Sequence, residues 1–157
     1  MPDRQSAATV VYYPTSYGKF AVDSLADSKM ARSFEQGVHP NEPLLRFAKA
    51  CTDETSIVLD VGAHIGTFTV PISMHVRKVI AFEPAEKTLD LLRENVATNA
   101  ASVDIRTCAL GRTEGRAGIV ERKDENAGAN TLGEGNAIKV STLDNEVDRA
   151  DFIKIDV

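Results

Sequence analysis

Two acidic residues, Asp60 and Glu83, stand where an apolar run of the sequence gives way to a turn. Asp60 lies within the run 57–61, which Gly62 ends, and Glu83 directly follows the run 78–82. Glu83 comes about 20 residues after the glycine turn, the separation at which an acid accepts hydrogen bonds from ribose hydroxyls in dinucleotide-binding folds. The pair therefore predicts a site for a ligand that contains a nucleoside.

The spacing of the glycines favours one such ligand over another. The turn reads Gly62-Ala63-His64-Ile65-Gly66, a Gly-x-x-x-Gly pattern, whereas pyrophosphate binding requires Gly-x-Gly-x-x-Gly. Asp60 would repel a pyrophosphate but attract the sulfonium and ammonium groups of S-adenosylmethionine (SAM). The absence of a Cβ at Gly62 lets the backbone pass close beneath a ligand, and the N-terminus of the following helix suits a carboxylate. The sequence therefore predicts SAM as the cofactor.

Other interpretations of these residues remain open. Glu83 could instead favour the N-terminus of the following helix, and Asp60 could accept hydrogen bonds from nearby backbone N–H groups. The chain could then be a nicotinamide-dinucleotide-binding oxidoreductase domain or a non-catalytic Rossmann-like binding module. Fluorescence titration with NADH and calorimetry with SAM separate the three interpretations.

Strands that alternate with helices must hold these residues in place. Continuous apolar runs predict buried strands, and apolar residues at helical spacing predict helices. Strands are expected at residues 57–61, 78–82, 103–108 and 151–157, and helices at 24–36, from 41, at 65–75, from 84 to 99 and at 142–147. This alternation predicts an α/β fold, a parallel sheet with helices on both faces.

The other segments predict a lead-in and a hairpin. Residues 1–40 are expected to form an extended and helical lead-in to a domain at residues 41–157. Residues 111–136 predict a hairpin with a mobile loop near 125–136. Pro71 lies inside the expected third helix and predicts a bend or a later start, because an interior proline removes a hydrogen bond.

Four segments together resemble, in order, the motifs of the FkbM family of methyltransferases. They are Leu59-Asp60-Val61-Gly62-Ala63-His64-Ile65-Gly66, Ala81-Phe82-Glu83-Pro84, Ala109-Leu110-Gly111 and Asp151-Phe152-Ile153-Lys154-Ile155-Asp156-Val157. The resemblance covers residues 40–157, and the stretch 17–20 is similar to the family's lead-in. It implies a class I Rossmann-like methyltransferase fold, SAM as methyl donor, and methyl transfer to a hydroxyl group of a sugar or related natural product.

The same resemblance implies a role for each site residue. Those implied to hold the methionine portion of SAM are Asp60, Gly62, Ala63, His64 and Asp156. Those implied to hold its adenosine are Glu83 on the ribose, Pro84 beside the adenine, and Cys108 and Ala109 lining the adenine pocket. No general base is assigned, and no metal site is predicted, because no histidines and carboxylates share a metal-ligand spacing.

The sequence departs from the family pattern in several places. His64 stands where the family often has asparagine, and Thr107-Cys108 offers no acid to the adenine amino group. The family motif continues past the residues that match Val157 with Glu-Gly and further elements, which would carry the general base and the acceptor pocket. We therefore expect the cofactor-binding half of an enzyme, truncated after the fourth parallel strand and inactive alone.

Composition excludes several classes of protein. Acidic residues outnumber basic ones by 23 to 18, which argues against nucleic acid or an anionic membrane as a partner. No apolar run approaches the ~20 residues of a membrane span, and no signal peptide is evident. Cys51 and Cys108 are expected to be buried thiols, and His39 and His75 to be solvated or locally bonded. These features favour a cytoplasmic protein, and the resemblance implies a hydroxylated small molecule as acceptor.

The fourth strand predicts a dimer. In the implied strand order it lies at an edge of the sheet, leaving Phe152, Ile153 and Ile155 uncovered, and such an edge is a template for pairing. We expect a homodimer through this exposed fourth-strand edge, by a self-complementary contact. Lys154 argues mildly against it, since lysines are a common means of blunting edges.

Overall fold

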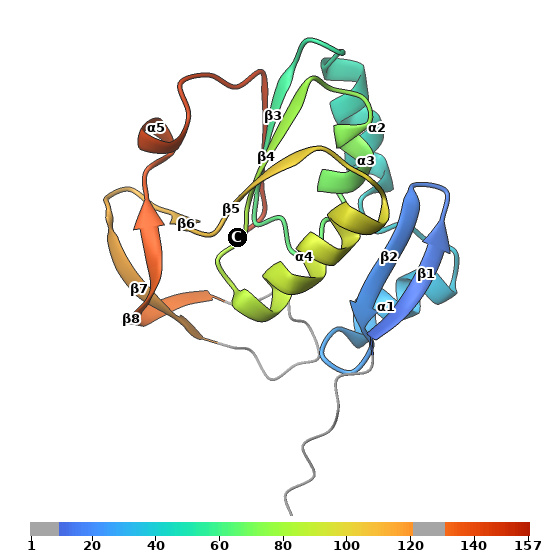
Figure 1. Ribbon diagram of the computed structural model, residues 1–157, viewed down its shortest axis with the longest axis horizontal. Coiled ribbons are helices and arrows are strands. Elements are labelled where there is room, and N and C mark those ends of the chain that lie inside the picture. Colours follow the sequence, from blue (N-terminus) through green and yellow to red (C-terminus); the bar gives the residue numbers. More distant parts are fainter. Residues whose placement is uncertain (1–9, 121–130) are drawn as a thin grey trace, which may run out of the picture.

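A four-stranded parallel sheet forms the centre of the computed structural model, which describes residues 10–120 and 131–157 (Figure 1). Its strands lie in the order β5 (Val103–Arg106), β4 (Lys78–Phe82), β3 (Ile57–Val61) and β9 (Phe152–Ile155). All three pairings are parallel. The expected Rossmann-like α/β fold is confirmed, and its strand order brings the carboxyl ends of β3 and β4 side by side.

Helices cover the two faces of this sheet unequally. The face that carries Val58 and Val79 packs against α2 (Glu42–Cys51) and α3 (Thr69–Ser73). The longest helix, α4 (Glu86–Thr98), packs against the same face through Leu89 and Leu92, which meet Ala81. On the opposite face, the cluster includes Leu110 and Leu143 from two short elements, β6 (Ala109–Leu110) and α5 (Leu143–Glu146). The apolar runs of β3 and β4 are therefore buried on both sides, as their sequence predicts.

An N-terminal hairpin and helix precede the sheet. Strands β1 (Val10–Thr15) and β2 (Gly18–Asp23) pair antiparallel, and α1 (Ser28–Glu35) packs on them through Phe34 against Phe20. Helix α1 begins later than expected because the Asp27 side chain caps it, accepting the Met30 N–H at 3.2 Å. Leu25, within the range expected to be helical, lies before this helix and is 56% exposed.

Asn95 of α4 and Asn99, the residue that caps the C-terminus of this helix, bind strand β2 as a neighbouring strand would. Asn95 accepts the Ala21 N–H at 2.6 Å and donates to the Ala21 carbonyl at 3.1 Å. Asn99 accepts the Lys19 N–H and donates to the Lys19 carbonyl, both at 2.8 Å. The spacing fits, because four helical residues rise about 6 Å and two strand residues about 6.7 Å. We call these two side chains the asparagine ladder.

Local geometry accounts for several differences from the expected elements. Helix α3 starts only at Thr69, so Pro71 falls in its first turn, where its missing N–H costs no helical hydrogen bond. Residues 131–136, expected in a mobile loop, belong to β8 (Thr131–Ser141), which pairs with β7 (Gly115–Val120) and β6. The rest of that expected loop, 125–130, lies outside the described residues.

Burial also corrects expectations for single side chains. Cys51 is exposed rather than buried, and the apolar side chain of Phe47 in α2 is 61% exposed. His39 is 5% exposed, and neither of its ring nitrogens has a hydrogen-bond partner among the described residues. It packs among Tyr17, Phe20 and Phe34. His75 is locally bonded, with Nε2 3.0 Å from the Thr52 carbonyl.

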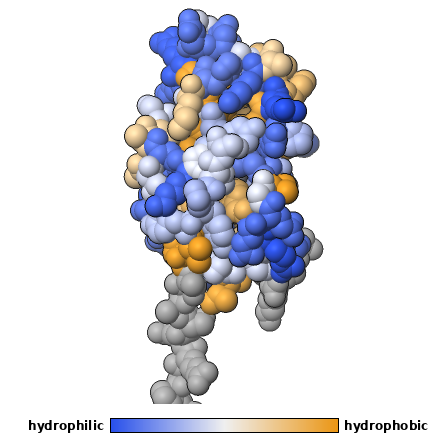
Figure 2. Space-filling view, turned by 90° about the vertical axis from the view of Figure 1, so that its right-hand side faces the viewer, coloured by the Kyte–Doolittle hydropathy of each residue, from blue (hydrophilic) through white to orange (hydrophobic). Residues whose placement is uncertain are grey.

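The surface is mixed in character. The face turned to the right of Figure 1 is largely hydrophilic, with separate hydrophobic patches (Figure 2). Such scattered apolar side chains are usual on soluble surfaces. In the described part of the chain, every helix is too short or too polar to cross a bilayer.

Candidate functional site

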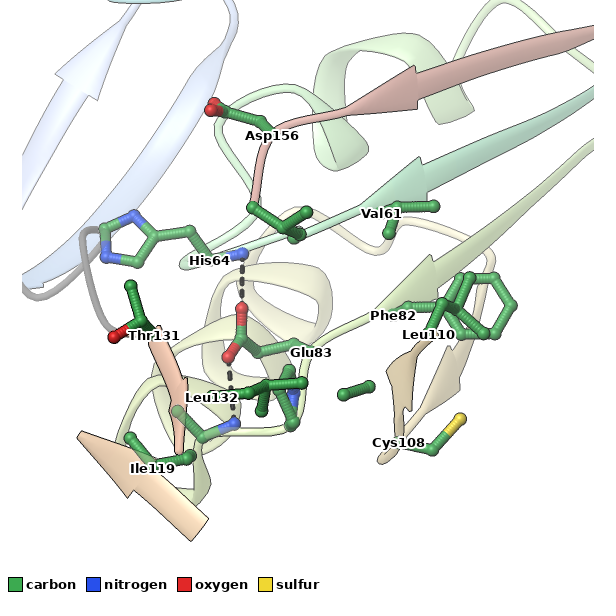
Figure 3. A pocket seen from close by; sticks show the side chains of 15 residues that line it. Val61, His64, Phe82, Glu83, Cys108, Leu110, Ile119, Thr131, Leu132 and Asp156 are labelled. Atoms are coloured by element: carbon green, nitrogen blue, oxygen red, sulfur yellow. Dashed lines mark hydrogen bonds between the residues drawn. The ribbon is translucent and has the colours of Figure 1, made fainter. Parts of the chain in front are cut away.

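A pocket of about 240 Å³ opens where β3 and β4 end (Figure 3). In open parallel sheets, ligands bind beyond the carboxyl ends of the strands, where the strand order reverses. The predicted site residues that line this pocket are Gly62, His64, Glu83, Pro84, Cys108, Ala109 and Asp156. The other two, Asp60 and Ala63, are buried and do not belong to the lining. The fold thus brings most of the predicted residues together.

Glu83 is fixed at the end of β4 by backbone groups from both sides of the pocket. Oε2 accepts the His64 N–H and Oε1 accepts the Ala85 N–H, each at 2.9 Å (Figure 3). Burial raises the pKa of Glu83, and these two hydrogen bonds oppose the rise. A carboxylate has about four acceptor positions, so two remain for ligand hydroxyls. The contact with His64 also ties Glu83 to the glycine turn.

The glycine turn is shaped by the protein's own backbone. Gly62 has a φ of 77°, and a Cβ there would collide with the Asp156 carbonyl oxygen. The N–H groups of Gly62 and Ala63 both donate to the Phe82 carbonyl at 3.0 Å. These two N–H groups are therefore not available to a ligand. A ligand at the turn must be held by other groups.

Asp60 is neutralised inside the sheet by Lys154. The side chain of Asp60 is fully buried, with Oδ1 2.8 Å from Lys154 Nζ and Oδ2 bonded to the Thr69 hydroxyl. Lys154 also donates to the Gly62 carbonyl at 2.9 Å. Burial raises the pKa of Asp60, while Lys154 and Thr69 oppose the rise. Lys154 therefore does not blunt the edge of the sheet, because its ammonium group is bonded to Asp60 inside the sheet. Asp60 in turn binds Lys154 and Thr69, and not nearby backbone N–H groups.

His64 meets an acid that the sequence did not indicate. Its φ is 54°, and Nε2 lies 3.3 Å from Oδ2 of Asp27. The contact is too poorly aligned to be a hydrogen bond, so both atoms lack such a partner among the described residues. Burial and then Lys154 lower the pKa of His64 to about 4, against an opposing effect of Asp156. The position of Asp27 before a helix marks it locally as a helix cap. Its contact with His64 could not be predicted in this way, because the two residues lie far apart in the sequence.

The far wall of the pocket comes from the β7–β8 hairpin. Ile119, Thr131 and Leu132 line the pocket together with Cys108 and Ala109. Ile119 and Leu132 are register partners on the two strands. Burial raises the pKa of Cys108, so its thiol is neutral. This wall was not predicted from the sequence. The pattern of residues 111–136 indicates that two strands pair, but it does not indicate which part of the fold the hairpin packs against.

The described residues include no cluster of three or more His, Cys, Asp and Glu side chains arranged to hold a metal ion.

Comparison with known proteins gives a likeness of fold. No protein-family model and no curated protein matches the chain. A putative transferase from Pyrococcus horikoshii is similar over 66% of this chain, at 22% identity and a TM-score of 0.50. This identity shows the fold alone, and the chain spans 37% of the length of that transferase.

Smaller overlaps occur with other solved structures. A putative methyltransferase from Streptococcus mutans, in complex with SAH, is 30% identical over 45% of this chain and 40% of its own, with a TM-score of 0.42. A tRNA (uracil-54, C5)-methyltransferase from Pyrococcus abyssi, in complex with S-adenosyl-L-homocysteine, is 17% identical over 62% of this chain and 23% of its own, with a TM-score of 0.46.

Proposed function

We propose that the chain binds SAM in the pocket at the ends of β3 and β4, as the cofactor-binding part of a methyltransferase. The observation that carries this proposal is Glu83. Its carboxylate is held by two backbone N–H groups and keeps acceptor positions for the cofactor's two ribose hydroxyls. The apolar wall from the β7–β8 hairpin suits an adenine ring beside it.

A dinucleotide fits this site less well. A pyrophosphate is bound by free backbone N–H groups at a glycine turn, and Gly62 and Ala63 already use theirs on Phe82. Asp156 at the pocket would also repel a pyrophosphate.

The resemblance of the sequence supports a hydroxyl group of a sugar or natural product as methyl acceptor. The net charge of −5 gives little attraction for RNA. Radiolabelled SAM offered with hydroxylated metabolites and, separately, with tRNA tests this choice. Label in tRNA alone would contradict a small-molecule acceptor.

Calorimetry on Glu83 variants tests the cofactor proposal. Glu83→Ala removes the acceptor for the ribose hydroxyls and should weaken SAM binding by about 1.5–3 kcal/mol, the range for hydrogen bonds to a charged group. Glu86→Ala is the matched control: Glu86 lies in the first turn of α4, three residues after Glu83, and this variant should bind as the unaltered chain does. Equal affinity for SAM in both variants would disprove the ribose assignment, and binding of NADH but not SAM would favour the oxidoreductase alternative.

A further inference from the structure

Asp27 brings a buried carboxylate from the N-terminal lead-in to the edge of the pocket. The residue is 4% exposed, and its two oxygens have different surroundings. Oδ1 caps α1 through the Met30 N–H, whereas Oδ2 faces His64 and has no hydrogen-bond partner among the described residues. An unpaired carboxylate oxygen is costly to bury, so its presence beside a ligand pocket requires an explanation.

The charges around the glycine turn give Asp27 no ion pair with a lysine or arginine among the described residues, and Lys29 acts on it only from a distance. Lys154 is bonded to Asp60 and lies 3.9 Å from a carboxylate oxygen of Asp156. Around His64, the carboxylates of Asp27 and Asp156 therefore outnumber the one ammonium, that of Lys154, which already pairs with Asp60, so this end of the pocket attracts a cation.

The carboxylate of Asp27 lies 3.3 Å from His64 Nε2 and acts on the imidazole by its charge, without a hydrogen bond. A carboxylate beside Nε2 favours a proton on that nitrogen, which leaves Nδ1 as a hydrogen-bond acceptor. With its pKa lowered to about 4, the ring is neutral near pH 7 and a weak general base. The pair therefore suits the binding of an N–H donor better than the removal of a proton from an acceptor hydroxyl.

We propose that His64 Nδ1 accepts a hydrogen bond from the ammonium group of the cofactor's methionine portion, and that Asp27 is the positioning residue that keeps the proton on Nε2. This inference rests on the proposed function and refines it. The sequence suggests that Asp60 binds the cationic part of the cofactor, but Asp60 is paired with Lys154. In this inference, His64 of the glycine turn and Asp27 of the N-terminal lead-in take that role. The ring is turned away from Glu83, as an amino-acid portion extending from the ribose requires (Figure 3).

Three ligands separate this contact from the rest of the site. SAM and S-adenosylhomocysteine carry the amino-acid portion, whereas 5′-methylthioadenosine keeps the adenosine and lacks the ammonium group. Calorimetry of the full chain with each ligand gives three affinities per variant. A variant that removes only the ammonium contact weakens the first two ligands and spares the third.

Asp27→Asn and His64→Gly are the informative variants. Asparagine caps a helix as well as aspartate does, so Asp27→Asn keeps α1 while removing the charge. Glycine keeps the positive φ at position 64 and the backbone N–H that binds Glu83, while removing the ring. We expect about tenfold weaker binding of SAM and S-adenosylhomocysteine for His64→Gly, about threefold or more for Asp27→Asn, and less than about twofold change for 5′-methylthioadenosine.

Two controls complete the design. Asp23→Asn makes the same chemical change at a nearby side chain that bonds the Leu25 and Ala26 N–H groups, and should alter no affinity. Glu83→Gln should weaken all three ligands. Equal losses for all three ligands in Asp27→Asn, or unchanged affinity for SAM in both informative variants, would overturn the inference. An unaltered chain that binds none of the ligands would instead refute the proposed function and the inference with it.

Discussion

Lys154 carries an ammonium group into the interior of the sheet, where Asp60 is its charged partner. Such a pair is expensive to break, because each charge has lost its water and depends on the other. The side chain of Lys154 also donates a hydrogen bond to the Gly62 carbonyl, so this one residue of β9 fixes both the end of β3 and the glycine turn. At the scale of single residues, this contact is the structural support of the pocket.

Lys154→Met is expected to lower the free energy of unfolding by about 3–5 kcal/mol, because Asp60 is left buried without a counter-charge. Asp60→Asn in the same chain removes that charge and can still accept the Thr69 hydroxyl. The double variant should therefore recover most of the loss. Urea unfolding followed by circular dichroism measures the free energy of unfolding of Lys154→Met and of the double variant. A Lys154→Met variant as stable as the unaltered chain would contradict the buried pair.

At the scale of elements, the asparagine ladder joins the hairpin to α4. Its members differ in burial: Asn95 is fully buried and also donates to the Ile65 carbonyl at 2.8 Å, whereas the contacts of Asn99 with β2 are exposed to solvent. Water can replace the partners of Asn99 but not those of Asn95. The ladder's contribution to stability is therefore concentrated at one side chain.

Asn95→Ala should lower the free energy of unfolding by about 3 kcal/mol or more, since it strands buried backbone groups at Ala21 and Ile65. Asn99→Ala is the matched variant one helical turn away and should cost about 1 kcal/mol or less. Urea unfolding gives both values, and amide exchange at Ala21 reports the local loss. Equal costs for the two variants would show that burial does not separate them.

Features that depend on a local sequence pattern could be predicted, whereas contacts between distant segments could not. The strands at 57–61 and 78–82 and the acid at Glu83 were predicted, because apolar runs and turns are local. The strand order was implied by the family resemblance. The contact of Asp27 with His64 and the position of the β7–β8 wall were not predicted. They depend on how elements distant in the sequence pack, and no spacing within one element records that packing.

At the scale of the whole molecule, buried histidines couple stability to pH. Burial lowers the pKa of His39 in the folded chain, and the pKa of His64 falls to about 4. Below about pH 6.5, the unfolded chain therefore binds protons that the folded chain does not, so stability falls as pH falls. Asp27, Asp60 and Glu83 have raised pKa values and act in the opposite direction.

His39→Phe isolates one part of this dependence. Phenylalanine suits the aromatic surroundings of position 39 and does not titrate. Between pH 6.5 and the lowered pKa of His39, the free energy of unfolding of the unaltered chain should fall more steeply than that of the variant, by up to about 1.4 kcal/mol per pH unit. Urea unfolding from pH 7.5 to 5 measures the two slopes, and identical slopes would rule out a neutral buried His39.

The edge of the sheet bears on association. Strand β9 pairs with β3 on one side, and Ile153 and Ile155 are 41% and 67% exposed. The expected homodimer through this edge stays a prediction, which sedimentation at micromolar concentration tests. Ile155→Lys should shift the chain towards monomer, because a charge on an open edge opposes pairing. A monomer in the unaltered chain would contradict it.

The asparagine ladder also has a consequence for the order in which the chain is made. Ala21 leaves the ribosome 74 residues before Asn95, its partner in the folded protein. At about 5–20 residues per second, the free edge of β2 waits about 4–15 seconds for the helix that will cover it. The hairpin must remain soluble through that interval with its backbone uncovered, so it joins the fold only after α4 has been synthesised.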